Sequence, residues 1–429
     1  MCFSGFKIKR RNTVAAIFLV VMFADANSAF AQTETVLYSF GQQAGQGATP
    51  WGSLIQDTVG NFYGTTEQGG ANGIGTVFEL SPPATKDGAW AETVLYSFGG
   101  QPGDGANPYD NLLIDKEGNL YGTTYGGGAS EAGTVFELSP EKSDAWSETV
   151  LYSFGGAPND GSLPHAGLIM DNAGNLYGTT YGGGASNDGT VFELSPEKSG
   201  AWSEAVLYAF RGGSNDGSLP YAGLIMDKSG NFYGTTTEGG AYTFGTVFKL
   251  SPEKGGGWAE SVLYSFGTQS EDGVNPYGGL IMDKESDLYG TTSGGGKYAY
   301  GEVFKLSPHT GESGLWTETI LYSFGSFSSD GTYPFDSLIM DTASNLYGTT
   351  VGGGKYTFGT VFEMSPPSEK SGRWTEKVLY SFGKQISTGE EPWDSLIMDA
   401  EGNLYGTTTD GGTTNHCDYG CGTVFKLTP

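Results

Sequence analysis

Apolar and polar positions follow one order that recurs from about residue 33 to the end of the chain. A representative copy has a short apolar run at 112–114, an acid-x-x-Gly-Asn segment at 115–119 and a second apolar segment at 120–124. A glycine-rich stretch follows, and then apolar segments at 134–138 and 148–154 that flank a Ser-Pro turn. The four segments are rich in β-branched and aromatic residues and show no helical period. They therefore predict a four-stranded antiparallel meander joined by tight turns.

The meander is copied seven times. Each copy carries the string Tyr-Gly-Thr-Thr, whose tyrosines are Tyr63, Tyr121, Tyr177, Tyr233, Tyr289, Tyr347 and Tyr405. Seven such units of about 56 residues predict an all-β fold, a seven-bladed β-propeller of four-stranded antiparallel blades. A parallel β-helix fits less well, because its coils are roughly half this length or less.

The phase of the repeat predicts how the ring closes. Residues 35–40 have the composition of a fourth strand, although no blade precedes them. The last strand of the chain, at 423–427, has the composition of a third strand. We therefore expect the N-terminal strand to complete the last blade by pairing with the C-terminal strand.

The first 31 residues lie outside the repeats. They combine a basic start at 7–11, an uncharged apolar run at 14–24 and the small-x-small sequence Ala29-Phe30-Ala31. These features predict a cleaved signal peptide at 1–31, followed by a single propeller domain at 32–429. The apolar run is too short to span a bilayer, so we expect no transmembrane segment in the mature chain. The expected location is secreted or periplasmic.

Charge excludes one class of partner. The chain has a formal net charge of −27, and removal of the basic leader makes it more negative. Such a chain repels phosphate backbones, so nucleic acid is not an expected partner.

We also expect the mature protein to be a monomer.

Two cysteines remain after the predicted leader, Cys417 and Cys421, in one loop of the last repeat. Export favours a disulfide between them. The alternatives are a metal site that also uses His416 and Asp418, and a pair of free thiols. Structural zinc prefers Cys-x-x-Cys pairs, which this loop lacks.

The strings TVLYSF, GLIMD, GNLYGTT and GTVFELSP, in this order, resemble the GloVer repeat, the Gloeobacter/Verrucomicrobia-type tandem repeat of exported bacterial proteins. The resemblance covers essentially the whole predicted mature chain. It implies an extracytoplasmic repeat protein with no established reaction. A fainter similarity, P-x-GL-x-x-D-x-x-GN-x-Y, extends to NHL-type and streptogramin-lyase-like propellers.

One position of the repeat carries a ring side chain just before the innermost strand. It follows a proline in each inter-blade connection and is occupied by Trp51, Tyr109, His165, Tyr221, Tyr277, Phe335 and Trp393. We expect these residues to surround the mouth of the central channel as a binding site for a carbohydrate or protein ligand, because aromatic faces combine apolar area with a polar edge. The alternative is that the rings wedge between blades and meet no ligand.

Carboxylates occupy two further repeated positions. Five precede the ring position: Asp104, Asp160, Asp216, Asp272 and Asp330. They suit calcium or a cationic ligand, or each forms an Asx-turn with its own backbone. The acids of the acid-x-x-Gly-Asn turns are expected to be structural. We therefore expect no cofactor, with calcium as the one alternative.

Catalysis usually needs one residue that breaks the symmetry of the repeats. The histidines are His165 at the ring position, His309 in a Ser-Pro hairpin and His416 in the cysteine loop. No nucleophile elbow, zincin helix or phosphate-binding loop is present in the sequence. The first hypothesis is therefore a binding or scaffold module. The alternative is a lyase or glycan-active hydrolase that uses His165 as general base.

Overall fold

The computed structural model describes residues 33–85, 88–142, 145–308, 316–369, 372–385, 387–413 and 416–428. The predicted signal peptide and His309 lie outside these ranges. Residues 32–429 form one compact unit. Every regular element in the described ranges is a β-strand, and none of these residues belongs to a helix with the length and apolarity needed to cross a membrane.

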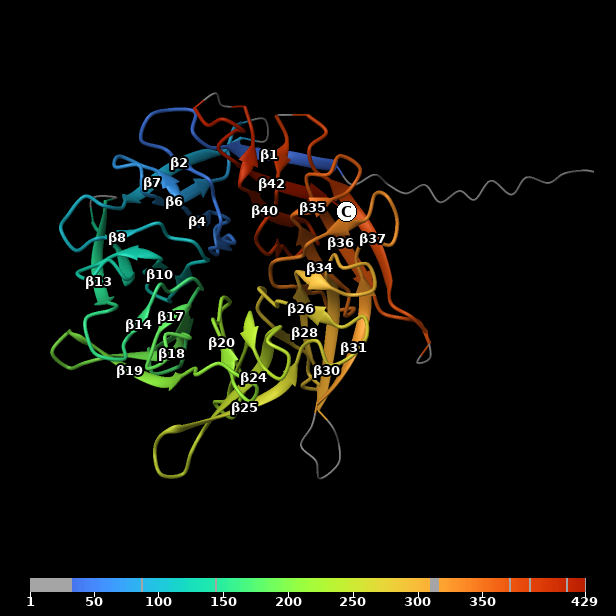
Figure 1. Ribbon diagram of the computed structural model, residues 1–429. Coiled ribbons are helices and arrows are strands. Elements are labelled where there is room, and N and C mark those ends of the chain that lie inside the picture. The colour runs from blue at the N-terminus through green and yellow to red at the C-terminus, as the bar shows by residue number, and fades with distance from the viewer. Residues whose placement is uncertain are drawn as a thin grey trace, which may run out of the picture. The chain divides into compact units, whose positions relative to one another are not determined.

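Seven four-stranded antiparallel sheets follow one another around a circle, which confirms the predicted seven-bladed propeller (Figure 1). Each sheet begins with a two-residue strand at the central cavity. In the order of blades one to seven, these innermost strands are β3 (Ile55–Gln56), β9 (Leu113–Ile114), β15 (Ile169–Met170), β21 (Ile225–Met226), β27 (Ile281–Met282), β33 (Ile339–Met340) and β39 (Ile397–Met398).

The second strand of each blade carries Tyr-Gly-Thr-Thr. These strands are β4 (Phe62–Thr66), β10 (Leu120–Thr124), β16 (Leu176–Thr180), β22 (Phe232–Thr236), β28 (Leu288–Thr292), β34 (Leu346–Thr350) and β40 (Leu404–Thr408). Nearly all of their residues are buried. Since both faces pack against neighbouring blades, the sequence shows apolar runs rather than an alternation.

The third strands are β6 (Thr76–Ser81), β12 (Thr134–Pro140), β18 (Thr190–Pro196), β24 (Thr246–Pro252), β30 (Glu302–Pro308), β36 (Thr360–Ser365) and β42 (Thr423–Thr428). The outermost strands of blades one to six are β7 (Ala91–Ser97), β13 (Trp146–Ser153), β19 (Trp202–Ala209), β25 (Trp258–Ser265), β31 (Trp316–Ser323) and β37 (Thr375–Ser381).

The outermost strand of blade seven is β1 (Thr33–Ser39). It pairs antiparallel with β42 from Thr33 opposite Thr428 to Ser39 opposite Thr423. The ring therefore closes through the two ends of the repeat region, as the phase of the repeat predicts. In Figure 1 the blue strand β1 lies beside the red strand β42.

The inter-blade connections and the glycine-rich loops pair at one end of the ring. The resulting two-stranded ribbons are β2 (Gly47–Ala48) with β5 (Gln68–Gly69), β8 (Gly105–Ala106) with β11 (Gly126–Gly127), β14 (Gly161–Ser162) with β17 (Gly182–Gly183), β20 (Gly217–Ser218) with β23 (Glu238–Gly239), β26 (Gly273–Val274) with β29 (Gly294–Gly295), β32 (Gly331–Thr332) with β35 (Gly352–Gly353), and β38 (Gly389–Glu390) with β41 (Asp410–Gly411). The acid-x-x-Gly-Asn turns form local hydrogen bonds, since Asp115 Oδ1 accepts the backbone N–H groups of Glu117 and Asn119 at 2.9 and 2.8 Å.

The core consists of clusters that join adjacent blades. One cluster combines Val135 and Phe154 of blade two with Leu176 and Phe192 of blade three. The Phe154 and Phe192 rings meet edge to face with centroids 5.1 Å apart. Equivalent pairs occur at the other junctions, including Phe40 with Phe78 across the closure. Each such pair contributes about 0.5–1.5 kcal/mol beyond its buried area, so the interfaces make the ring rigid.

Candidate functional site

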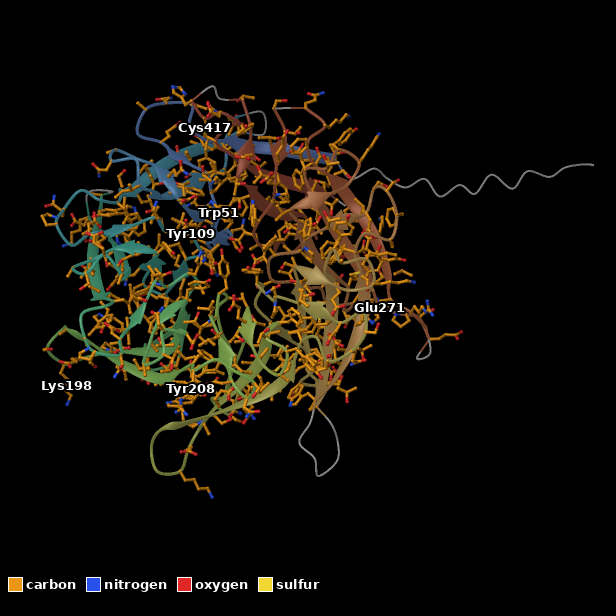
Figure 2. The ribbon with its side chains drawn as sticks, in the orientation of Figure 1. Trp51, Tyr109, Lys198, Tyr208, Glu271 and Cys417 are labelled. Atoms are coloured by element: carbon orange, nitrogen blue, oxygen red, sulfur yellow. A yellow bond between two sulfur atoms is a disulfide. The ribbon has the colours of Figure 1, made fainter. Side chains whose placement is uncertain are left out.

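The seven ring residues that follow the prolines line one central cavity of about 190 Å³. All seven are half-buried. Figure 2 labels two of them, Trp51 and Tyr109, at the inner edge of the ring of blades. We call this set the collar.

Each collar ring contacts both of its neighbours around the circle. Tyr109 stacks on His165 with centroids 4.6 Å apart. The centroid distances of the other neighbouring pairs are 5.8 Å for Trp51–Tyr109, 3.8 Å for His165–Tyr221, 5.1 Å for Tyr221–Tyr277, 5.1 Å for Tyr277–Phe335, 4.7 Å for Phe335–Trp393 and 4.8 Å for Trp393–Trp51. The collar is therefore a closed circuit of contacts, and every member also faces the cavity.

Hydrogen bonds between blades fix the chain at the collar. The first threonine of Tyr-Gly-Thr-Thr donates to the backbone carbonyl of the residue that follows the next blade's collar ring. For example, Thr123 Oγ1 donates to the Ala166 carbonyl at 3.0 Å. The equivalent donors are Thr65, Thr179, Thr235, Thr291, Thr349 and Thr407. The repeated motif thus sets the position of the site as well as the strand.

His165 lies between two tyrosines. Its ring is 4.6 Å from that of Tyr109 and 3.8 Å from that of Tyr221. Burial lowers the pKa of His165 to about 4, so the imidazole is neutral at neutral pH. A general base works best with a pKa near the working pH. The geometry makes His165 a member of the collar and a weak base.

The residue after each collar ring breaks the symmetry. It is aspartate in three blades, at Asp110, Asp336 and Asp394, and glycine or alanine in the other four. The next residue is Ser53, Asn111, Ser337 or Ser395 in blades one, two, six and seven, and glycine in blades three, four and five. Gly52, Ala166 and Gly278 are not among the residues that line the cavity. Every other residue at these two positions of the repeat lines it. One side of the cavity is therefore acidic and polar, and the other is made of small residues.

Two of the three carboxylates are well bonded. Asp394 is 8% exposed, and its Oδ1 accepts hydrogen bonds from Ser53 Oγ at 2.7 Å and from the Ser395 N–H at 2.6 Å. Asp110 accepts from the Asn111 and Gly167 N–H groups at 2.6 and 2.7 Å. These bonds hold both carboxylates in place among the residues that line the cavity.

Asp336 keeps one oxygen without an ordinary hydrogen-bond donor. Its Oδ1 accepts the Ser337 N–H at 2.6 Å, whereas its Oδ2 is buried and receives no hydrogen bond from a backbone, hydroxyl, amide or cationic donor of the described residues; the carboxyl of Asp394 lies within hydrogen-bonding reach of Asp336. The indole N–H of Trp51 is also buried and likewise unpaired. Both residues line the cavity. The wall of the cavity therefore contains a buried acceptor and a buried donor that lack an ordinary partner, and leaving such groups unpaired is costly.

Charge repulsion and burial act on the same carboxylates. Burial, and then the charge of Asp336, raise the pKa of Asp110 to about 7. Burial and the charges of Asp336 and Asp110 hold the pKa of Asp394 well above its usual range. No lysine or arginine is among the residues that line this cavity. A cation in the cavity would relieve this repulsion.

The sequence predicted the collar residues, and the structure brings all seven together at the centre; their binding of a ligand stays a prediction. Sequence reasoning missed Asp110, Asp336 and Asp394. The available signal was the position after the collar ring, which is aspartate in some copies and glycine or alanine in the rest.

Cys417 and Cys421 lie in the loop that precedes β42, with sulfur atoms 1.99 Å apart as in a disulfide. The Cys421 carbonyl accepts the Thr49 N–H at 2.9 Å. The bridged loop therefore supports the connection that leads to Trp51, on the polar side of the cavity.

The sheet order, the seven blades and the central cavity define a seven-bladed β-propeller. The model of the Gloeobacter/Verrucomicrobia repeat matches residues 27–229 and 203–416, and the chain belongs to this repeat family. None of the curated proteins matches the sequence.

Solved structures share the fold at low identity. The extracellular domain of a putative one-component system from B. thetaiotaomicron matches with a TM-score of 0.54 and 14% identity over 92% of this chain and 42% of the other. An ancestral GH74 enzyme matches with a TM-score of 0.53 and 12% identity over 93% of this chain and 51% of the other. The chain thus spans at most about half the length of these two proteins. Such identities establish the fold alone.

Proposed function

We propose that the protein is an exported binding module whose collar and central cavity hold a cationic nitrogen of a carbohydrate or protein ligand. The observation that carries this proposal is the pair of carboxylates Asp336 and Asp394, which lie against each other inside a closed collar of seven rings, with no cationic donor among the residues that line the cavity. An amino sugar and a lysine side chain share the required chemistry, an ammonium group close to hydroxyl or carbonyl oxygens. The ammonium would donate to Asp336, and a ligand oxygen would accept the Trp51 indole N–H.

The collar and the charge both favour a cation. Aromatic faces attract cations by about 0.5–2 kcal/mol, most strongly where water is excluded. The carboxylates add attraction, and the net charge of −27 raises the local concentration of cations. The cavity of about 190 Å³ is smaller than typical pockets of about 300–1,000 Å³, so it suits one group of a larger ligand.

Binding accounts for the site better than catalysis by His165 does. Both faces of the imidazole are covered by tyrosines, and its lowered pKa makes it a weak base. The propeller fold itself does not decide the matter, because one fold hosts many functions. Export is supported by the basic and apolar leader in residues 1–31 and by the resemblance to exported repeat proteins.

Calorimetry with matched ligand pairs tests the proposal. The first pair is a glucosamine dimer and its N-acetylated form, and the second is a lysine peptide and its acetyl-lysine form. At about pH 7 we expect the amine member of one pair to bind about tenfold more tightly than its acetylated partner, a difference of about 1.4 kcal/mol. The pair that shows the difference identifies the source of the ammonium.

Asp336→Asn should remove this preference, whereas Glu117→Gln, an exposed acid in the hairpin of blade two, should keep it. For the lysine peptide, whose ammonium stays charged throughout, affinity should also fall about tenfold as the pH decreases from about 8 to about 5.5, because Asp110, with a pKa of about 7, becomes protonated and loses its attraction for the cation. Equal binding of amine and acetylated forms would reject the proposal, as would turnover of a glycan that disappears in His165→Ala.

A further inference from the structure

Carboxylates also gather away from the central cavity, at the junctions between blades. At five junctions an aspartate of the connection lies near a glutamate of the next outermost strand: Asp104 with Glu148, Asp160 with Glu204, Asp216 with Glu260, Asp272 with Glu318, and Asp330 with Glu376. Each aspartate Oδ2 accepts the hydroxyl of the tyrosine eight residues earlier. In all five pairs the aspartate Oδ1 and the glutamate Oε1 are buried and have no hydrogen-bond partner among the described residues.

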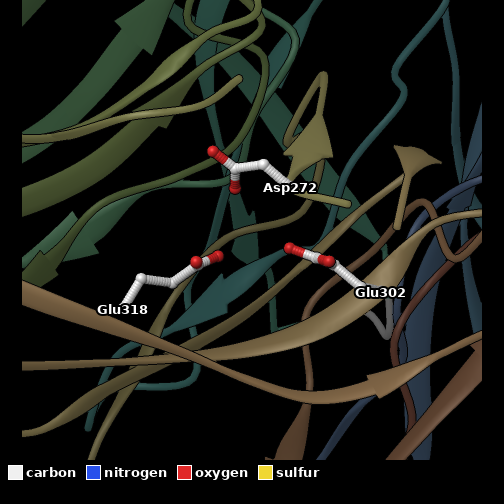
Figure 3. Close-up of side chains that lie close together, drawn as sticks. All are labelled: Asp272, Glu302 and Glu318. Atoms are coloured by element: carbon white, nitrogen blue, oxygen red, sulfur yellow. The ribbon is translucent and has the colours of Figure 1, made fainter. Parts of the chain in front are cut away.

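The junction between blades four and five differs from the rest by one residue. In six blades the third strand begins with a threonine, whose hydroxyl hydrogen-bonds a threonine of the second strand at 2.8 Å. In blade five this position is Glu302, which is fully buried. Glu302 points toward Asp272 and Glu318, and the three carboxylates face a common centre (Figure 3).

Hydrogen-bond donors from the surrounding chain reach these three carboxylates but leave one oxygen of each without such a donor. Glu302 Oε1 accepts the Gly273 N–H at 2.9 Å. Asp272 Oδ2 accepts the Tyr264 hydroxyl at 3.0 Å and the Thr268 N–H at 2.7 Å. Asp272 Oδ1, Glu302 Oε2 and Glu318 Oε1 are buried and have no hydrogen-bond donor among the described residues outside these three carboxylates. The ion pairs in the described ranges, Lys284–Glu285 and Lys305–Asp287, involve none of the three.

The dimensions suit a calcium ion. One oxygen from each of the three residues lies within 4.8 Å of the other two. Oxygens bound to Ca²⁺ lie at about 2.3–2.6 Å from the ion, so two of them are at most about 5 Å apart. Mg²⁺ demands a regular octahedron and retains several waters, which fits a buried set of three carboxylates less well. Asp272 is 6% exposed and Glu302 is 0% exposed, so these ligands are already desolvated and oriented.

We propose that Asp272, Glu302 and Glu318 form a calcium site that fastens blade four to blade five. The two positive charges of calcium bound there would offset most of the negative charge of three carboxylates that otherwise repel one another, and the ion would join the connection after β25 to strands β30 and β31. The other four pairs lack the third carboxylate, so one ion per chain binds tightly. The site is separate from the collar, and the calcium proposal does not depend on the ligand that is proposed for the central cavity.

The test uses the whole mature chain, stripped with a chelator and titrated with Ca²⁺ by calorimetry and by thermal unfolding. We expect one tight site per chain and a rise in Tm of about 5 °C at about 1 mM Ca²⁺. Mg²⁺ at the same concentration should produce a clearly smaller shift.

Glu302→Thr restores the residue of the other six blades and should fold. We expect this variant to lose the tight site and the Tm rise, and to melt no lower than the parent in chelator. Glu302→Gln, which keeps the shape, should behave in the same way, and Glu253→Gln, an exposed acid of the blade-four hairpin, should bind like the parent. Unchanged calcium binding in Glu302→Thr and Glu302→Gln would overturn the proposal, as would a parent chain that binds no calcium.

Discussion

A chain that lacks residues 32–41 should melt about 10 °C or more below the full mature chain. This deletion removes β1, which forms the outer edge of blade seven through its pairing with β42. It also removes Phe40, which is fully buried and meets Phe78 of blade one at 5.0 Å. Loss of a buried phenylalanine alone costs about 3–5 kcal/mol, and the deletion also leaves β42 as an unpaired edge.

Differential scanning calorimetry measures this effect. A synthetic peptide with the sequence of residues 32–41 provides the control, because an added strand pairs with an open edge. We expect it to restore the Tm as its concentration rises, whereas a scrambled peptide should not. A truncated chain that melts within a degree or two of the parent would show that the ends do not close the ring.

The second large effect is expected from Gly133→Ala. Gly133 has a φ of +96°, and a Cβ there would lie 2.5 Å from Pro164 Cδ and 2.5 Å from the Thr124 carbonyl oxygen. Since neither neighbour is a flexible side chain, strain and overlap together should cost about 3 kcal/mol. Pro164 precedes His165, so displacement of this proline should also weaken ligand binding at the collar.

Gly174→Ala is the matched control. Gly174 has a φ of +87°, but its Cβ would meet nothing within 4 Å. This change should cost only the backbone strain, about 1 kcal/mol, and leave ligand binding intact. Equal losses of unfolding free energy in the two variants, measured with denaturant, would contradict the packing role of Gly133.

The fold could be predicted because one pattern recurs with few changes. The seven Tyr-Gly-Thr-Thr repeats predicted the number of blades. The segments at 35–40 and 423–427 predicted that the first and last strands pair to close the ring. The two-stranded ribbons were harder to foresee. At Gly127 the chain approaches the backbone so closely that a Cβ would lie 2.4 Å from the Asp104 carbonyl oxygen, and a glycine-rich stretch by itself gives no sign of such a partner.

The collar was predictable because each copy contributes the same kind of residue at the same position. The acidic side of the cavity was not predicted, since it depends on departures from the repeat. Asp110 and Asp336 belong to blades two and six, and they come to line the same cavity only when the ring closes. Glu302 is a departure of the same kind, since a single exchange of threonine for glutamate adds a third carboxylate to one junction.

The central claim is that the centre of the ring is the binding site and that it selects a cationic nitrogen. A crystal structure of the protein with the preferred amine ligand from the calorimetric comparison tests this claim most directly. The account predicts a ligand nitrogen at about 3 Å from Asp336 Oδ2, surrounded by the collar rings. A ligand bound instead on the exposed loop that carries Tyr242 and Phe244, with the central cavity empty, would contradict it.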